Sequence, residues 1–263
     1  MKLQITLIAL AFCLALGVFT WLCSLVRKDA SLADRAWPVA IGGAGLIQVL
    51  LLPGAPSQRA IVMALLGAAW ALRLGVYVTA RNWGHGEDRR YRDMRLRNEP
   101  GFAWKSLYLV FGLQAVLAWI VAAPFLAGAM GERPWGWPDT AGAALGAFGI
   151  AFEAVGDAQL ARFKADPAHH GQVMDRGLWR YTRHPNYFGE CCVWWGLWLM
   201  AAHGAGWSGA WSIVSPVVMS LLLLKVSGVS LLERDIAQRR PAYRDYVART
   251  NAFLPGPPRR TAG

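Results

Sequence analysis

Residues 4–25 read QITLIALAFCLALGVFTWLCSL and contain no charged side chain. An α-helix needs about 20 consecutive apolar residues to cross the hydrocarbon core of a bilayer. The run is longer than the apolar core of a cleaved signal peptide and lacks a clear small-residue cleavage site, so it predicts a retained first membrane helix. The composition agrees, because 55% of the 263 residues are hydrophobic and only 16% are charged.

Further apolar runs follow along the chain and predict an all-α integral membrane bundle of seven transmembrane helices. The second and sixth runs are the shortest. No Gly-rich loop joins a strand to a helix, so a soluble nucleotide-binding domain is not predicted. The expected spans are 4–25, 36–54, 60–80, 104–130, 140–162, 187–203 and 208–230.

Basic residues alternate between loops, as expected of a chain that crosses the membrane at each predicted span. The loops after the first, third and fifth spans hold three, six and five basic residues, whereas the other loops hold one, one and none. We therefore expect the N-terminus outside and the C-terminus in the cytoplasm. Because topology already accounts for much of the net charge of +11, no nucleic-acid partner is expected.

The stretch GLWRYTRHPNYFGE at 177–190 gathers polar side chains at the start of the sixth span. Arg180 and Arg183 can each bind a phosphate as bidentate donors. The helix that follows Pro185 would present unpaired N–H groups and a positive dipole end to an anion. This combination suits a phosphorylated cofactor or a lipid headgroup.

Five ionisable residues inside the predicted spans stand out, because a charge there is costly unless it is paired, solvated or used for function. Their position toward the basic side favours a polar cavity open to the cytoplasm, and ion pairs that fasten the bundle are the structural alternative. Glu153 and Asp157 share one face of the fifth span. The five residues are Arg73, Glu153, Asp157, Glu190 and Lys225.

Two charged segments lie outside the spans. GHGEDRRYRDMR at 84–95 mixes acids with arginines, which suits a dinucleotide because arginines hold phosphates and carboxylates accept ribose hydroxyls. The alternative is a surface loop whose acids and arginines form ion pairs with one another. The tail at 231–258 is amphipathic and broken by Pro241, and it predicts an interfacial anchor or a cover for a cofactor site. The four cysteines and five histidines lack metal-ligand spacing, so no metal is expected.

RYTRHPNYFGE, preceded by GEDRRYRDMR and followed by VSGVSLLERDIAQRRPAYRDYVARTNAFLP, resembles the bacterial, DUF1295-type branch of the steroid 5-alpha-reductase family over residues 70–257. Sterol C14-reductases are more distant relatives. The resemblance implies a seven-helix membrane enzyme that uses NADPH to reduce the C4–C5 double bond of a 3-oxo-Δ4-steroid, or a similar lipophilic enone. It also implies one domain, with substrate-pocket helices at 1–130 and a cofactor-binding half at 131–263.

From the resemblance we further expect a monomer in the bacterial inner membrane, with its cofactor site facing the cytoplasm. Asn186 and Glu190, with Tyr187 between them, match the residues that hold the nicotinamide and ribose. The implied NADPH-binding residues are Arg73, Arg81, Glu87, Asp88, Arg90, Tyr91, Arg95, Asp157, Lys164, Arg176, Tyr181, Arg183, His184, Asn186, Tyr187, Glu190, Lys225 and Glu233.

The implied catalytic positions depart from the eukaryotic pattern of this family. Asp34 best matches the glutamate near the start of the second span, and Trp70 occupies the position of the third-span tyrosine. Tyr77 is an alternative phenol one helical face away, and Gln48 could supply an amide donor. The candidate catalytic residues are therefore Asp34, Tyr77 and Trp70, and the identity of the proton donor stays open.

Two other interpretations remain. The RHPNYFG element and the acidic tail also resemble membrane methyltransferases that act on isoprenylcysteine or phospholipid with S-adenosylmethionine. Those enzymes often carry two adjacent acids where this chain has Glu233 and Arg234, and they would not explain the segment at 84–95. A non-enzymatic sterol-binding membrane protein is the third interpretation.

Overall fold

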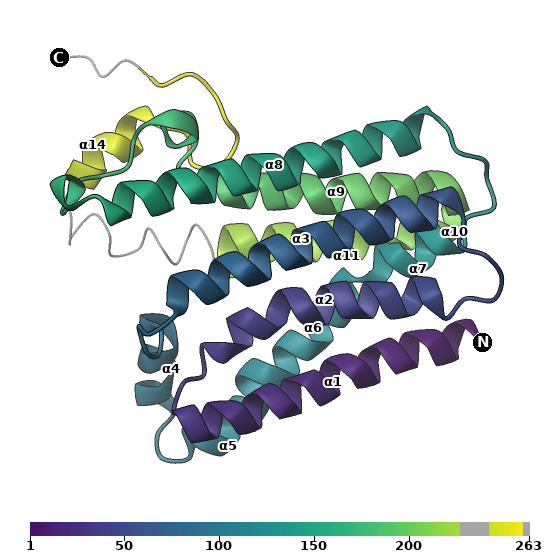
Figure 1. Cartoon of the computed structure of the whole chain (residues 1–263), viewed down its shortest axis with the longest axis horizontal. Coiled ribbons are helices and arrows are strands. Elements are labelled where there is room, and N and C mark those ends of the chain that lie inside the picture. The colour runs from purple at the N-terminus through teal and green to yellow at the C-terminus, as the bar shows by residue number, and fades with distance from the viewer. Residues whose placement is uncertain (227–241, 260–263) are drawn as a thin grey trace. The chain divides into compact units, whose positions relative to one another are not determined.

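The computed structural model describes residues 1–226 and 242–259, and every regular element in those ranges is a helix (Figure 1). The predicted all-α class is therefore confirmed for this part of the chain. A π-helical segment, Leu107–Gly112, joins α5 to α6, and another, Leu222–Val226, follows α11. The α-helices are α1 (Lys2–Arg27), α2 (Leu32–Leu50), α3 (Gln58–Asn82), α4 (Arg89–Asn98), α5 (Phe102–Ser106), α6 (Leu113–Val121), α7 (Ala123–Ala129), α8 (Trp137–Ala165), α9 (Pro185–Ala205), α10 (Trp207–Ala210), α11 (Val214–Leu221) and α14 (Ala242–Arg249).

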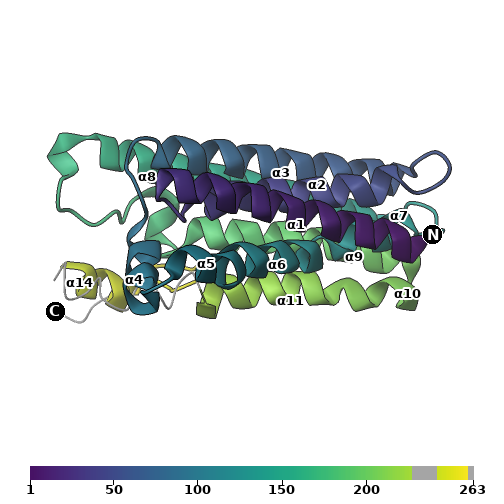
Figure 2. The same cartoon turned by 90° about the horizontal axis from the view of Figure 1, so that it is seen from below.

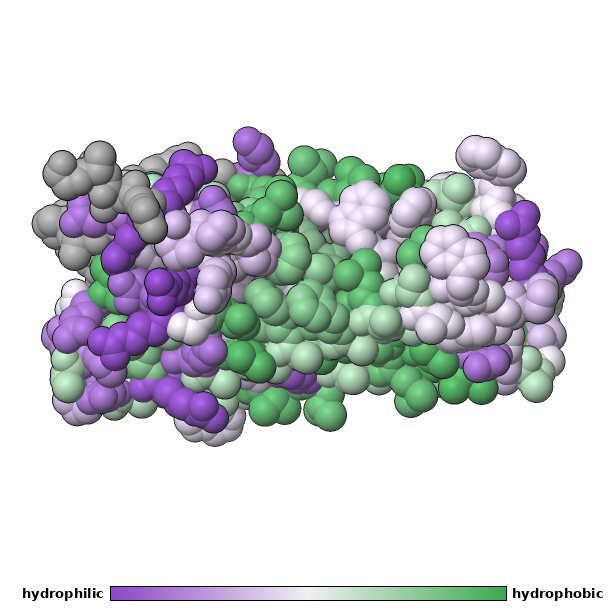
Figure 3. Space-filling model, turned by 90° about the horizontal axis from the view of Figure 1, so that it is seen from above, coloured by the Kyte–Doolittle hydropathy of each residue, from purple (hydrophilic) through white to green (hydrophobic). Residues whose placement is uncertain are grey.

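Within the described ranges, five helical stretches are long and apolar enough to cross a membrane. They correspond to the first, third, fourth, fifth and seventh predicted spans. Helices α2 and α9 form where the second and sixth spans were expected but are not among the five, so seven spans and the orientation of the termini stay predictions. On the face drawn in Figure 3, hydrophobic residues gather in the middle and hydrophilic residues at the two ends.

Two boundaries differ from the sequence prediction because helix formation does not require apolar residues. Helix α2 begins at Leu32 rather than at residue 36, with Asp34 in the first turn, where the positive end of the helix dipole favours an acid. The charged segment expected as a loop becomes helix α4 from Arg89. The Asp88 carboxylate caps α4 by accepting a hydrogen bond from the Arg90 backbone N–H at 2.9 Å.

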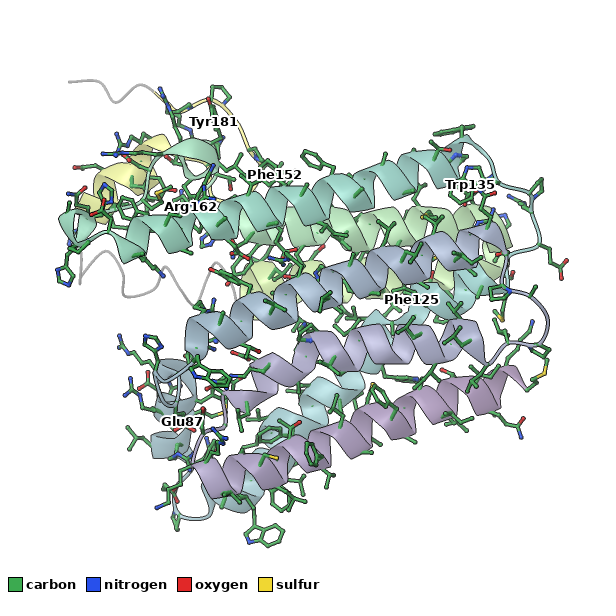
Figure 4. All side chains as sticks on the ribbon, in the orientation of Figure 1. Glu87, Phe125, Trp135, Phe152, Arg162 and Tyr181 are labelled. Atoms are coloured by element: carbon green, nitrogen blue, oxygen red, sulfur yellow. The ribbon has the colours of Figure 1, made fainter. Side chains whose placement is uncertain are left out.

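Contacts divide the chain into two compact units, which are described separately: Met1–Ala143 with Leu197–Ser215, and Ala144–Gly196 with Pro216–Gly263. In the first unit α1, α2 and α3 run side by side, and α6 packs against α1 and α2 (Figure 2). The Phe125 ring of α7, labelled in Figure 4, fills space left by Gly45 and Gly67. A Cβ on Gly45 would lie 2.7 Å from this ring, and one on Gly67 2.4 Å. Small residues thus allow the helices of this unit to approach closely.

A buried ion pair fastens the ends of several helices in the first unit. Arg59 at the start of α3 donates from Nε to Asp139 Oδ1 at 2.6 Å and from Nη2 to Asp139 Oδ2 at 2.9 Å. The side chains are 3% and 0% exposed. His203 Nδ1 lies 2.8 Å from the same carboxylate, and the Gly136 N–H also donates to it. Bidentate geometry and additional donors compensate for the cost of burying these charges.

In the second unit α8 and α9 approach each other closely at glycines of both helices. A Cβ on Gly149 would lie 2.5 Å from the Gly189 carbonyl oxygen, closer than real Cβ atoms come. A Cβ on Gly156 would lie 3.1 Å from Pro185, and the Trp179 indole N–H donates to the Gly156 carbonyl at 2.9 Å. These contacts place the first turn of α9 against the part of α8 that carries the predicted acids.

Candidate active site

In the first unit, Asp34 is the acceptor of a hydrogen-bond chain built from three helices. The Tyr91 hydroxyl on α4 donates to Asp34 Oδ1 at 2.6 Å, and Gln114 on α6 donates from Nε2 to the Tyr91 oxygen at 3.2 Å. Arg90 Nη2 donates to Asp34 Oδ2 at 2.7 Å and Arg90 Nε donates to Asp88 at 3.0 Å. We call Asp34, Arg90, Tyr91 and Gln114 the Asp34 network. It holds a phenol between a carboxylate and an amide.

The Asp34 network adjoins a small apolar cavity. The cavity has a volume of about 20 Å³ and is lined by residues of α1, α2, the π-helical segment and α6, among them Ala33, Trp37, Phe111 and Gln114. Tyr91 itself is 6% exposed and packs in a core cluster with Trp21, Phe102 and Phe111. A space of this size holds about one water molecule. Any larger ligand would require these side chains to move.

Burial and neighbouring charges shift the pKa values of Tyr91 and Asp88, which both lie outside the membrane-spanning helices. Burial, the nearby Asp34 charge and the hydrogen bond to Asp34 raise the pKa of Tyr91 well above its ordinary value of 10.0, so the phenol stays protonated at neutral pH. Burial opposes ionisation of Asp88, but hydrogen bonds from Arg90 and its positive charge outweigh this and lower the pKa of the carboxyl. The phenol is therefore held as a protonated hydrogen-bond donor to the Asp34 carboxylate.

Glu87 forms a second anchor between α4 and the turn before α2. It accepts two hydrogen bonds from Arg95, from Nη2 at 2.7 Å and from Nε at 3.1 Å, and one from the Ala30 N–H at 2.8 Å (labelled in Figure 4). The Arg95 guanidinium also lies 4.7 Å from the centre of the Phe102 ring. The acids and arginines of the 84–95 segment therefore pair with one another and with Asp34, as the self-paired alternative expects. Their assignment to a cofactor remains a prediction.

The α3 candidates lie apart from these hydrogen bonds. Trp70 is fully buried in α3, and Tyr77 is partly exposed with its ring centre 5.6 Å from the Arg81 guanidinium carbon. Among the described residues Asp34 bonds to α4 rather than to Trp70 or Tyr77. Arg73 is also on α3 and is partly buried. The structure thus joins one catalytic candidate, Asp34, to two residues predicted to bind cofactor, Arg90 and Tyr91.

The second unit brings the acids of α8 close to the start of α9. Glu153, Asp157 and Glu190 are 2%, 3% and 6% exposed. A Cβ on Gly189 would lie 3.0 Å from the Glu153 Cβ, and a Cβ on Gly156 would lie 3.6 Å from the Asn186 backbone nitrogen. The structure therefore gathers the predicted residues Asp157, Asn186 and Glu190 at one contact between α8 and α9.

The RYTRHP element is tied to the segment 242–259. The Arg183 N–H donates to the Asn251 carbonyl at 2.9 Å, and Arg183 Nη1 donates to the carbonyls of Val247 and Thr250 at 3.3 and 2.5 Å. Thr182 donates to the Phe253 carbonyl at 2.8 Å. Arg183, predicted as a phosphate ligand, thus supplies hydrogen bonds to the carboxyl end of α14.

The remaining predicted cofactor residues have varied surroundings. The His184 and Tyr187 rings stack with centres 5.4 Å apart. Tyr181 is 45% exposed (labelled in Figure 4), and Lys164, Arg176 and Lys225 are exposed. Glu233 lies outside the described residues, as does the break predicted at Pro241. Among the residues described, no group of three or more His, Cys, Asp or Glu side chains could hold a metal ion.

Gln114 is the member of the Asp34 network that the sequence analysis missed. It is the single amide in the predicted fourth span, 104–130. A polar side chain in an apolar membrane run is costly unless it has a partner, so this isolated amide was a usable signal. Tyr91 was identified, but as a cofactor ligand rather than as a phenol bonded to Asp34.

Comparison with known proteins identifies relatives without an established activity. A family model described as "Protein of unknown function (DUF1295)" matches residues 20–250. The chain is also similar to the "Uncharacterized protein C594.04c" of Schizosaccharomyces pombe, with 26% identity over 271 residues that cover 91% of this chain and 76% of the yeast protein. No solved structure matches the chain.

Proposed function

We propose, from the premise that this chain belongs to the DUF1295 family, that it is a membrane oxidoreductase that reduces the double bond of a lipophilic enone with NADPH. The family includes steroid 5-alpha-reductase-like proteins, and the C4–C5 bond of a 3-oxo-Δ4-steroid is the model substrate. The observation that carries the proposal is the bond from the Tyr91 hydroxyl to Asp34 beside an apolar cavity. A bacterial inner-membrane location with a cytoplasmic cofactor site belongs to the same proposal.

The Asp34 network would supply the proton of the reaction. The Tyr91 hydrogen is donated to Asp34 in this structure, so the hydroxyl would have to turn from Asp34 to an oxygen of the substrate, while Gln114 continues to donate to the phenol oxygen. As the substrate oxygen gains negative charge, Tyr91 stabilises it by a hydrogen bond. Asp34, with a 19% exposed side chain, can pass a proton from the aqueous side to Tyr91, while Arg90 holds the carboxylate in place.

The second unit contains groups that fit parts of a dinucleotide. The Asn186 Oδ1 atom is buried and has no hydrogen-bond partner among the described residues. A carboxamide N–H, such as that of nicotinamide, would satisfy this acceptor. Arg176 and Arg180 are exposed and form no ion pair within the described ranges, so both can hold phosphates. NADPH, when bound, would supply the reducing equivalent.

Ligand-induced stabilisation of the detergent-purified protein tests the cofactor. A ligand that binds only the folded state raises the midpoint of thermal unfolding. We expect NADPH to raise the midpoint and S-adenosylmethionine to leave it unchanged, followed by NADPH-dependent reduction of progesterone. Stabilisation by S-adenosylmethionine alone would replace the proposal with methyl transfer. No stabilisation by either ligand would favour a non-enzymatic protein.

Variants of the Asp34 network test the proton path. We expect Tyr91→Phe to lower kcat by roughly 10²- to 10⁴-fold, the usual contribution of a general acid, and to leave NADPH affinity unchanged. Asp34→Asn should also lower kcat. Tyr108→Phe is the matched control because Tyr108 is 62% exposed and lies outside the network. Full turnover in Tyr91→Phe would exclude this phenol as the donor.

Variants at the α8–α9 contact test the cofactor residues. We expect Asn186→Ala and Glu190→Ala to weaken NADPH binding more than they lower the thermal midpoint of the free protein. Progesterone reduction should fall in parallel with NADPH affinity. Unchanged NADPH affinity in both variants would remove the cofactor site from the start of α9.

A further inference from the structure

A groove of about 550 Å³ runs between α2 and α3 in the first unit. These two helices lie side by side in Figure 1. Most of the groove is apolar, with Val39, Leu72 and Val76 on its margins, 50%, 70% and 61% exposed. Gly75 leaves it open between these side chains. The volume falls in the range of ligand pockets, and α3 is one of the helices able to cross a membrane.

One end of the groove carries a cation that has no carboxylate partner within residues 1–226 and 242–259. Arg35 lines the groove, and its guanidinium forms one hydrogen bond within the described residues, from Nη2 to the Asn82 carbonyl at 3.0 Å. By contrast, Arg90 and Arg95 of the same unit each contact an acid. Arg35 Nε and Asn82 Nδ2 are buried donors that find no acceptor in the described part of the chain. A partly buried cation with unused donors beside it favours an anionic ligand.

We propose that this groove binds an anionic phospholipid of the bilayer. The lipid phosphate binds Arg35 at the end of the groove, and an acyl chain lies along Val39, Leu72 and Val76. A neutral ketone would leave the Arg35 charge uncompensated, so the charge favours a full anion over an enone substrate. A free phosphate would leave the exposed apolar margins without a partner, so the apolar surface favours a lipid over a soluble anion. This site is separate from the Asp34 network and does not depend on the proposed reductase activity.

Lipid binding to the full-length, delipidated protein tests the proposal. The probes are dioleoyl phosphatidylglycerol, dioleoyl phosphatidylcholine with identical acyl chains, and glycerophosphoglycerol without acyl chains, each followed by native mass spectrometry. We expect phosphatidylglycerol to bind more tightly than phosphatidylcholine by about tenfold or more, because both carry the phosphate but the choline ammonium brings a positive charge close to Arg35 and leaves the lipid without net charge. Equal affinity for the two lipids would overturn the proposal. Equal binding of the acyl-free headgroup would overturn the assignment to a lipid.

Three variants locate the site. Arg35→Gln should weaken phosphatidylglycerol binding about tenfold or more and phosphatidylcholine binding much less, so that the preference for the anionic lipid is lost. Gly75→Leu should weaken both lipids by filling the groove; the new Cβ itself meets only Pro38, at 3.6 Å. Arg97→Gln removes an exposed charge outside the groove and should change neither affinity. Unchanged phosphatidylglycerol binding in a folded Arg35→Gln protein would overturn the proposal, and the wild-type lipid comparison decides it if the variants do not fold.

Discussion

Gly149 and Gly189 face each other across α8 and α9 with no room for a methyl group on either. A Cβ on Gly149 would lie 2.5 Å from the Gly189 carbonyl oxygen, and a Cβ on Gly189 would lie 2.6 Å from the Gly149 carbonyl oxygen. Both obstacles are backbone atoms inside helices, which cannot swing aside as a side chain can. The glycine pair therefore fixes which residue of α8 lies beside Asn186.

Substitution of Gly189 by valine should separate α8 from α9. We expect the free energy of unfolding to fall by about 1–3 kcal/mol or more, the usual cost of overpacking, measured by thermal or denaturant unfolding in detergent. NADPH affinity should fall as well, because Asn186 moves with α9. Gly75→Ala is the control, since its Cβ would meet Pro38 at an ordinary 3.6 Å. Equal stability of the two variants would contradict the close approach.

Tyr91 should ionise at a higher pH than a free tyrosine. Its pKa is raised in the folded protein, so the stability linked to its protonated form is present below the unfolded value of about 10 and is lost as pH rises through the folded value. Alkaline titration of phenolate absorbance should show a late step to which Tyr91 contributes. This late step should be smaller in Tyr91→Phe. An unchanged step there would assign it to other tyrosines.

Removal of Arg59 should destabilise the first unit strongly. Arg59→Met leaves the Asp139 carboxylate buried without its main counter-charge, which costs about 3–5 kcal/mol in typical buried pairs. The double variant Arg59→Met/Asp139→Leu should recover most of this loss, because neither charge is then buried alone. Arg133→Gln removes an exposed charge from the neighbouring loop and should change the unfolding midpoint little. A double variant as unstable as Arg59→Met would argue against a charge effect.

Replacement of Arg183 by alanine should loosen the segment 242–259. The variant removes two donors to carbonyls at the end of α14, at Val247 and Thr250. We expect faster limited proteolysis within this segment, at least several-fold, while the helical circular dichroism of the membrane spans stays unchanged. Arg180→Ala is the matched control because Arg180 is exposed nearby. Equal cleavage rates in both variants would show that Arg183 does not hold the segment.

The sequence predicted the long apolar helices well because the cost of burying polar groups in lipid leaves a strong signal over about 20 residues. Residues 4–25 and 60–80 lie within α1 and α3. This apolar signal does not detect helices, or helix ends, that contain charged residues. The helix dipole favours Asp34 in the first turn of α2, and the Asp88 cap with basic residues in the last turn favours the highly charged α4.

The sequence analysis singled out several residues of the candidate site but did not predict which of them bond to one another. Asp34 and Tyr91 were each identified. They are 57 positions apart, so no local sequence pattern predicts the hydrogen bond between them. Arg183 is a residue type that binds phosphates, but here it donates to the backbone carbonyls of Val247 and Thr250, which carry no residue-specific signal. Pairings of this kind depend on tertiary packing, which a single sequence does not encode in any short motif.

The hydrogen bonds of Arg183 also impose an order on assembly during synthesis. Its side chain bonds to carbonyls 64 and 67 positions further along the chain, beyond the whole of α9. The ribosome therefore makes the RYTRHP element, and the membrane can receive the helix after it, well before Val247 and Thr250 exist. The loop before α9 can therefore reach its final conformation only after the segment 242–259 has been made, as a late step of folding.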